Sequence, residues 1–345
     1  MLKKITLLTA LLCGLVALRA TAQDELIKLS FEVRADYVRE QLDGHKIEEN
    51  SGFKGRFFNI CLNGSINEQL SYSYRQRLNR INKNNTFFDA TDWLNLTYRP
   101  NDRWGFSAGK LVVAMGGWEY DQTPIDTYFF SEFCSQVACY QWGAQVMHTL
   151  KGERDTFTLQ ASQSPSAAGR DLYAYGLQWS GRHGIFRPLY SVNMVEYAKG
   201  KFLNYIILGN RFELGRVTLD LDLTHRATDQ HPFWLRNCTL FGKVKVEACE
   251  KLHLFAQASY DVNQTSTADL TVQPDTEITR LGGGLEYYPL KGGNRNLRLH
   301  ATYCHSFGSN PSEIAVMQPK LSVVNVGLTW RMDILSFVHK LTHRD

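Results

Sequence analysis

Apolar and polar side chains alternate residue by residue through almost the whole chain after position 22. In one clear instance, four apolar residues alternate with Thr218, Asp220, Asp222 and Thr224: they are Val217, Leu219, Leu221 and Leu223. Successive side chains of a β-strand point to opposite faces, so each such segment has one apolar and one polar face. No stretch keeps a 3.6-residue apolar stripe beyond about three helical turns. The alternation therefore predicts an all-β fold.

The alternation recurs often enough to predict about sixteen strands. We expect them at residues 27–40, 53–66, 70–81, 91–99, 104–113, 140–150, 155–163, 172–180, 186–197, 202–214, 216–226, 239–249, 252–262, 277–288, 296–306 and 321–335. Short and long joints alternate between these segments. The short joints are 67–69, 99–103, 151–154, 181–184, 215, 250–251 and the somewhat longer 289–295. The long ones are 43–51, 82–89, 113–139, 164–171, 227–237, 263–276 and 307–320, with an exception near 199–201.

An even number of strands with joints that alternate in length is typical of a transmembrane antiparallel β-barrel of the bacterial outer membrane. Such a barrel satisfies its backbone hydrogen bonds within lipid, with apolar side chains outside and polar ones inside. Rings near the predicted strand ends would form interfacial girdles; they include Tyr37, Tyr72, Tyr74, Tyr98, Trp104, Trp142, Trp179, Tyr260 and Trp330. About sixteen strands leave a water-filled lumen. Short turns and both termini are then expected in the periplasm.

The first 22 residues have the three parts of a cleaved signal peptide. These are the charged pair Lys3-Lys4, an apolar run from Ile5 to Leu18, and the small-residue cleavage site Ala20-Thr21-Ala22. We therefore expect a signal peptide at 1–22 and one barrel at 23–345. Cleavage would remove three of the 38 basic residues and leave 35 against 34 acidic ones. This balance carries no basic footprint for nucleic acid, so no nucleic-acid partner is expected.

Six cysteines remain after cleavage: Cys61, Cys134, Cys139, Cys238, Cys249 and Cys304. An exported chain meets an oxidising compartment, and Cys134 and Cys139 lie close enough in sequence to bridge. The chain contains no CxxC pair and no clustered histidines, which makes zinc a poor interpretation. We expect no metal and no cofactor.

The segment from Gly105 to Asp121 reads Gly-Phe-Ser-Ala-Gly-Lys-Leu-Val-Val-Ala-Met-Gly-Gly-Trp-Glu-Tyr-Asp, and Pro124-Ile125 and Tyr128 follow it. Its Gly-Lys step, on a strand that leads into the third external loop, resembles the phosphate-selective porin O/P-like family. The resemblance is distinct over about residues 105–131 and loose elsewhere. The closing segment, Val324 to Met332, resembles a terminal strand that the barrel-assembly machinery recognises. The chain departs from the commoner ending by continuing from Ser336 to Asp345.

This resemblance implies a sixteen-stranded, homotrimeric porin in outer-membrane lipid. Such a porin lets small hydrophilic solutes or ions, including anions such as phosphate, diffuse passively. The near-zero net charge predicts only a mild ion preference.

The joint at 113–139 is the third external loop by this count, and in porins that loop folds into the lumen. Its many rings would form an exposed apolar patch if they stayed in water. We therefore expect an inward-folded loop whose constriction residues are Trp118, Glu119, Tyr120, Asp121, Asp126 and Glu132. The alternative is an external loop that packs on its neighbours or on a trimer partner.

Strand parity predicts which charges face the lumen. The basic candidates are Arg34, Arg75, Arg77, Lys110, Lys243, Lys245, Arg298 and Arg331, and the acidic ones are Glu32, Asp36, Asp220, Asp222 and Glu247. Asp220 and Asp222 lie on the strand next to Lys243 and Lys245, where they could pair. We expect the acidic loop residues to face Arg75, Arg77 and Lys110. For any single residue, a solvated wall without a selective role is the simpler interpretation.

Two other function classes remain open. One is an outer-membrane barrel enzyme of the phospholipase kind, because His305 and Ser306 lie near the outer end of a strand. Adjacent strand residues face opposite sides, so this pair cannot hydrogen bond, although Ser309 or Ser322 could approach His305. No catalytic residue is assigned. The other class is a surface β-protein that binds glycan, which would not need detergent for extraction.

Overall fold

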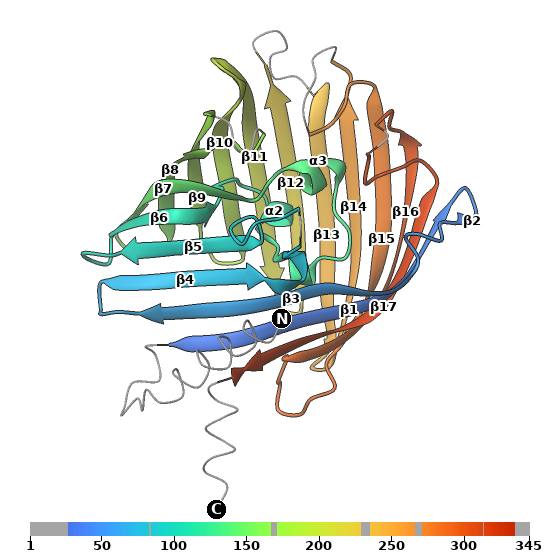
Figure 1. Cartoon of the computed structure of the whole chain (residues 1–345), viewed down its shortest axis with the longest axis horizontal. Coiled ribbons are helices and arrows are strands. Elements are labelled where there is room, and N and C mark those ends of the chain that lie inside the picture. The colour runs from blue at the N-terminus through green and yellow to red at the C-terminus, as the bar shows by residue number, and fades with distance from the viewer. Residues whose placement is uncertain are drawn as a thin grey trace, which may run out of the picture.

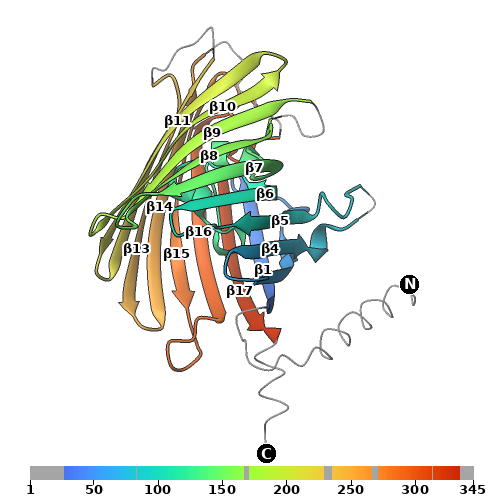
Figure 2. The ribbon, with the colours of Figure 1, turned by 90° about the vertical axis from the view of Figure 1, so that its left-hand side faces the viewer.

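A closed antiparallel barrel is the architecture of this chain in a computed structural model (Figures 1 and 2). The structure describes residues 27–334 except 83, 167–170, 229–234, 266–270 and 313. The expected signal peptide and the terminal extension from Ser336 therefore lie outside the described residues. Within this part of the chain, no helix is long and apolar enough to cross a membrane.

The barrel wall contains long strands and the two-residue β2. The strands are β1 (Lys28–Leu42), β2 (His45–Lys46), β3 (Gly52–Ser65), β4 (Leu70–Arg77), β5 (Thr91–Tyr98), β6 (Trp104–Val112), β7 (Tyr140–Thr149), β8 (Asp155–Gln163), β9 (Tyr173–Gly181), β10 (Phe186–Ala198), β11 (Lys201–Leu214), β12 (Val217–Ala227), β13 (Asn237–Cys249), β14 (Leu252–Asn263), β15 (Thr276–Tyr287), β16 (Leu297–Ser309) and β17 (Leu321–Asp333). Four short helical segments occur in the joints: η1 (Leu78–Arg80), α2 (Trp118–Asp121), η2 (Pro124–Asp126) and α3 (Glu132–Gln136).

The barrel closes where the first strand meets the last. β1 pairs antiparallel with β17, from Ser30 opposite Asp333 to Leu42 opposite Leu321. On its other edge β1 pairs with β3, and a bulge there leaves Arg56 as an extra residue between Gly55 and Phe57. The prediction of a transmembrane barrel of about sixteen strands is thereby confirmed.

Two local differences separate the observed strands from the expected ones. The segment expected at 70–81 ends as β4 at Arg77, because the chain turns into η1 and Arg77 N–H donates to Ala90 O in the following loop. The short β2 forms a hairpin extension of β1, and two residues are too few to produce a periodic signal.

The two faces of each strand separate by polarity. On β12, Leu221 is 44% exposed on the outward face, whereas Asp220 and Asp222 are buried on the lumen side. β4 to β9 are only 8–10 residues long, but β10 to β17 have 11–14. One side of the barrel is therefore a low wall.

The lumen is not polar everywhere. Segment 113–139, which contains α2, η2 and α3, lies inside the barrel in front of β12 to β14 (Figure 1). Val113, Met115 and Phe133 of this segment pack in one buried apolar cluster with Leu203 and Tyr205 of β11. β11 is therefore apolar on its inner face as well, because that face holds the folded segment.

Candidate functional site

The folded segment, residues 113–139, docks first on β10 and β11. Gly116 N–H donates to Ser191 Oγ at 2.7 Å, and Gly117 N–H donates to Leu189 O at 3.0 Å. A Cβ atom on Gly116 would lie 2.7 Å from Leu189 O, and one on Gly209 would lie 2.7 Å from Gly117 Cα. Glycine is therefore required at these positions by the close approach of the two backbones.

Two wall carboxylates hold the N-termini of the two α-helical turns. Asp222 on β12 accepts the N–H of Glu119 at 2.7 Å. Asp261 on β14 accepts the N–H of Glu132 at 2.9 Å and that of Phe133 at 3.2 Å. These first-turn N–H groups have no partner within a helix, so an accepting carboxylate stabilises the turn.

Glu119 and Glu132, expected at the constriction, are buried inside this anchoring region. Glu119 accepts Ser131 N–H at 2.6 Å and Ser131 Oγ–H at 2.7 Å. Burial raises the pKa of the Glu119 carboxyl group to about 8. Glu132 accepts Met317 N–H at 2.7 Å, and burial raises its pKa as well. Both carboxyl groups fasten the loop instead of lining a water-filled path.

The two aromatic constriction candidates are packed rather than free. Trp118 donates through Nε1 to Arg187 O at 3.1 Å, and the Arg211 guanidinium lies 3.8 Å from its ring centre. Tyr120 Oη–H donates to Cys139 O at 3.4 Å. These contacts fix the loop against β10 and against its own end.

Of the acidic loop residues, Asp126 meets basic wall residues. Its carboxylate pairs with Arg298 at 2.8 Å and with Arg331 at 2.7 Å. Asp121 borders a second cavity, called the inner chamber below. Opposed loop and wall charges therefore occur, but on β16 and β17, not at Arg75 and Arg77 as expected.

Arg75 and Arg77 share one wall carboxylate. Each Nε lies 2.7 Å from Asp92 Oδ2. Arg75 also donates to Tyr140 Oη at 2.6 Å and lies over the Trp93 ring at 3.8 Å. Two guanidinium groups against one carboxylate leave one positive charge at this point of the wall.

The remaining inward basic candidates bind the loop or neighbouring strands. Arg34 pairs with Asp36 at 2.8 Å and donates to Thr127 O at 2.6 Å. Lys243 donates to Gln122 Oε1 at 2.7 Å, and Lys245 pairs with Glu286 at 2.7 Å. The acidic Asp220, expected to be able to pair with Lys243, pairs with Arg211 at 2.6 Å.

The assignment of Lys110 to the lumen wall is wrong. Lys110 shares the outward face of β6 with Trp104, Phe106 and Ala108, and its Nζ donates to Phe88 O at 2.8 Å. Leu111 faces inward because it lies under the folded segment and borders the inner chamber. The loop thus makes the inner side of β6 apolar near its end, which reverses the expected parity.

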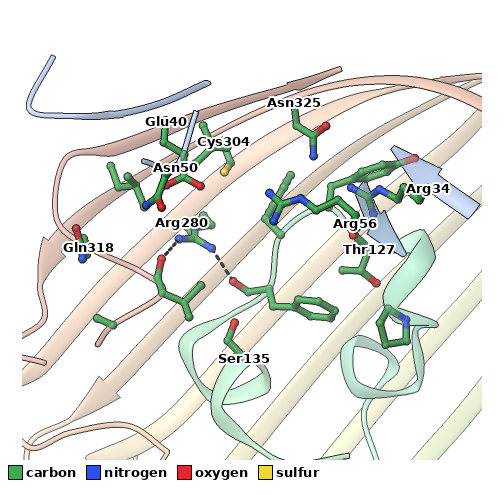
Figure 3. A pocket seen from close by; sticks show the side chains of 18 of the residues that line it. Arg34, Glu40, Asn50, Arg56, Thr127, Ser135, Arg280, Cys304, Gln318 and Asn325 are labelled. Atoms are coloured by element: carbon green, nitrogen blue, oxygen red, sulfur yellow. Dashed lines mark hydrogen bonds between the residues drawn. The ribbon is translucent and has the colours of Figure 1, made fainter. Parts of the chain in front are cut away.

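A basic cavity lies on the side of the folded segment toward the long loops, and we call it the outer chamber (Figure 3). Its volume is about 500 Å³. Five arginines line it against the single carboxylate of Glu40; they are Arg34, Arg56, Arg77, Arg80 and Arg280. Arg280 is held by Phe130 O at 3.0 Å and Val316 O at 2.6 Å.

Arg56, Arg80 and Arg280 were not among the residues expected from the sequence. Arg280 could have been found, since on β15 it alternates with the outward-facing Leu281. Arg56 could not, because the bulge in β3 breaks the alternation and turns an extra side chain toward the lumen.

A second cavity of about 560 Å³, the inner chamber, lies along β4 to β9 on the side toward the short turns. Its lining is rich in amides, hydroxyls and rings, including Trp93, Asn95, Gln122, Tyr140 and Gln145. Its charged lining residues are Arg75, Arg99 and Asp121. Pro124 of the folded segment borders both chambers.

All six cysteines in the described part of the chain are free, so Cys134 and Cys139 are not bridged. Among the same residues, no group of three or more His, Cys, Asp or Glu side chains is arranged to hold a metal ion.

The possible serine–histidine contact is present on the outward face. His305 Nδ1 lies 2.8 Å from Ser322 Oγ, whereas Ser306 is buried on the lumen side. Within the described residues, no carboxylate is hydrogen-bonded to the His305 ring. The pair therefore lacks the third group that orients the base in a catalytic triad.

Comparison with known protein families gives one match. The model of the family described as phosphate-selective porin O and P matches residues 27–189. This range contains residues 105–131, on which the resemblance was predicted, and the prediction is confirmed. No curated protein matches the chain.

Solved structures with the same fold are porins and related outer-membrane proteins. An anion-selective porin from Comamonas acidovorans has a TM-score of 0.65 at 11% identity, covering 89% of this chain and 99% of that one. OmpF of Salmonella typhi, in complex with daunomycin, has a TM-score of 0.62 at 13% identity, covering 89% and 97%. OmpT of Vibrio cholerae in its trimer form has a TM-score of 0.57 at 12% identity, covering 89% and 99%. At these identities the likeness shows the fold.

Proposed function

Because this chain is an outer-membrane porin that resembles the phosphate-selective porin family, we propose that its water-filled channel conducts small hydrophilic anions. Phosphate is included among the solutes. The family match and the fold indicate a channel and not an enzyme.

The observation that carries the anion preference is the lining of the outer chamber. Five guanidinium groups and one carboxylate line a cavity inside a low-dielectric wall. Such a wall focuses the field of like charges and raises the local concentration of counter-ions. The near-zero net charge predicted only a mild preference, but ions respond to the charge along their path.

The path follows from the two chambers. Short turns face the periplasm in barrels of this kind, so the outer chamber faces the cell exterior. An anion entering there passes the folded segment near Pro124, beside the Arg75–Asp92–Arg77 group, and leaves through the inner chamber. In this proposal, segment 113–139 sets the constriction.

We further propose a homotrimer. An eight-residue strand tilted by about 45° rises only about 19 Å, less than the roughly 25 Å apolar band of such barrels. The low wall of β4 to β9 is therefore best covered by neighbouring copies. The rest of the outward face contacts lipid, and the strand from Val324 to Met332 is the proposed signal for the barrel-assembly machinery.

Purified protein in planar bilayers under a potassium chloride gradient tests the function. We expect single-channel current steps and a reversal potential shifted toward the equilibrium potential of chloride. A reversal potential shifted toward the equilibrium potential of potassium would contradict the anion preference. Detergent-stable trimers, detected by cross-linking, would support the assembly, and monomers alone would contradict it.

A further inference from the structure

We propose that the inner chamber is a binding site for hydroxyl-bearing organic anions, such as a sugar phosphate or a sugar carboxylate. This proposal rests on the proposed anion channel and names its preferred solute class. Its basis is the difference in chemistry between the two chambers.

The outer chamber is the more strongly charged of the two, because five guanidinium groups and one carboxylate stand beside its amides and hydroxyls. The inner chamber has the chemistry that recognises hydroxyl groups. Amides such as Asn95 and Gln145 both donate and accept hydrogen bonds, as a hydroxyl does. Tyr140 and the face of Trp93 that Arg75 leaves uncovered add apolar surface against which the carbon skeleton of a sugar can lie. A bare inorganic anion would use little of this lining.

Two residues of the inner chamber carry donors without an acceptor among the described residues. Trp93 Nε1 and Gln122 Nε2 are buried and make no hydrogen bond within that part of the chain. Their other contacts are fixed: Arg75 lies over the Trp93 ring at 3.8 Å, and Gln122 Oε1 accepts from Lys243 at 2.7 Å. A buried donor without an acceptor is costly, and an oxygen of a bound solute would satisfy it. The two donors come from opposite sides, one from β5 and one from the folded segment.

Charge decides between a neutral and an anionic solute. Arg75 and Arg99 border the inner chamber against the carboxylate of Asp121, and Arg75 and Arg77 share Asp92 at its upper edge. Every solute must also cross the arginine-lined outer chamber. A solute with both a negative group and hydroxyl groups is favoured at each stage, whereas a neutral sugar is favoured only in the inner chamber.

The test measures block of the chloride current through single channels in planar bilayers. Two matched pairs of solutes are compared: glucose 6-phosphate with inorganic phosphate, and gluconate with acetate. We expect the hydroxylated member of at least one pair to block at a concentration about tenfold lower, as two hydrogen bonds would produce. The pair that shows the difference identifies the anionic group.

The variant Trp93→Phe removes one unpartnered donor and keeps the ring. We expect the half-blocking concentration of the hydroxylated solute to rise about threefold to tenfold, the value of one hydrogen bond, with the block by phosphate or acetate unchanged. Gln122→Met should act in the same direction. Trp104→Phe makes the same change on the outward face of β6 and should alter nothing.

Equal block by both members of both pairs would overturn the inference while leaving an anion-selective channel intact. The inference also fails if Trp93→Phe weakens hydroxylated and simple anions equally, since that result would reflect a general change of the pore. A wild-type protein that forms no anion-preferring channel would overturn the proposed function and this inference together.

Discussion

Asp261 on β14 accepts a hydrogen bond of 2.9 Å from the backbone N–H of Glu132, across the lumen surface from wall to loop. The same carboxylate accepts from Phe133 N–H and from Thr239 Oγ1–H. A single wall side chain thus holds the start of α3 in place. Its removal should loosen the folded segment without altering its sequence.

We expect Asp261→Ala to weaken docking of α3 by about 1–2 kcal/mol, as loss of a helix-capping carboxylate does. Single-channel recordings should show a noisier open current and a higher mean conductance. Asp43→Ala, which removes an exposed loop carboxylate, serves as the control. A quiet current of unchanged size in Asp261→Ala would show that α3 does not depend on this contact.

The close approach of Gly209 and Gly117 gives a second test. A Cβ at Gly209 would lie 2.7 Å from Gly117 Cα, so Gly209→Ala should push the folded segment away from β11 and change the conductance. Gly242→Ala on β13 is the matched control, because its Cβ would meet only Leu221 Cδ2 at 3.6 Å. Equal conductance in both variants would mean that the segment does not dock against β11 at Gly209.

Charge reversal in the outer chamber tests the origin of the ion preference. Arg56→Glu combined with Arg80→Glu should move the reversal potential toward the cation side, because two of the five lining arginines become acidic. Lys46→Glu in β2 with Lys320→Glu in the loop before β17 produces the same change in net charge outside the chamber lining. An equal shift from both pairs would assign the preference to overall surface charge.

Loop docking should depend on pH through Glu119. Burial raises its pKa to about 8 in the folded protein, against an ordinary value of 4.5. Between these two values the folded state binds more protons than the unfolded state, so stability falls as pH rises from about 4.5 to about 8. Current noise should therefore increase over this range.

The variant Glu119→Gln stays neutral and should remove that pH dependence. Glu68→Gln, in an exposed turn, should leave it in place. If the noise of Glu119→Gln still rises between pH 5 and pH 8, another group carries the effect.

The local sequence predicts much of the barrel. Period-two alternation is a property of each strand by itself, since a residue on the wrong face meets either lipid or water. It therefore predicted the strands, their polar and apolar faces, and the inward direction of Arg34, Arg298 and Arg331. The alternation of short and long joints predicted which end of the barrel has the short turns and which has the long loops.

The alternation predicted the wrong side-chain direction where the folded segment replaces water inside the barrel. Leu111 faces inward under this segment, so Lys110 lies outside, and Leu203 and Tyr205 make the inner face of β11 apolar. The alternation did not predict Arg56 as a lumen residue, because a bulge interrupts the pattern.

The partner of each lumen charge was decided only by the tertiary structure. Asp126 meets Arg298 and Arg331 because the folded segment crosses the lumen to β16 and β17, while Arg75 and Arg77 find Asp92 on the neighbouring strand. Strand parity gives a direction for a side chain but no distance across the barrel. That distance depends on closure of the sheet and on the path of the loop, which bring together residues far apart in the chain.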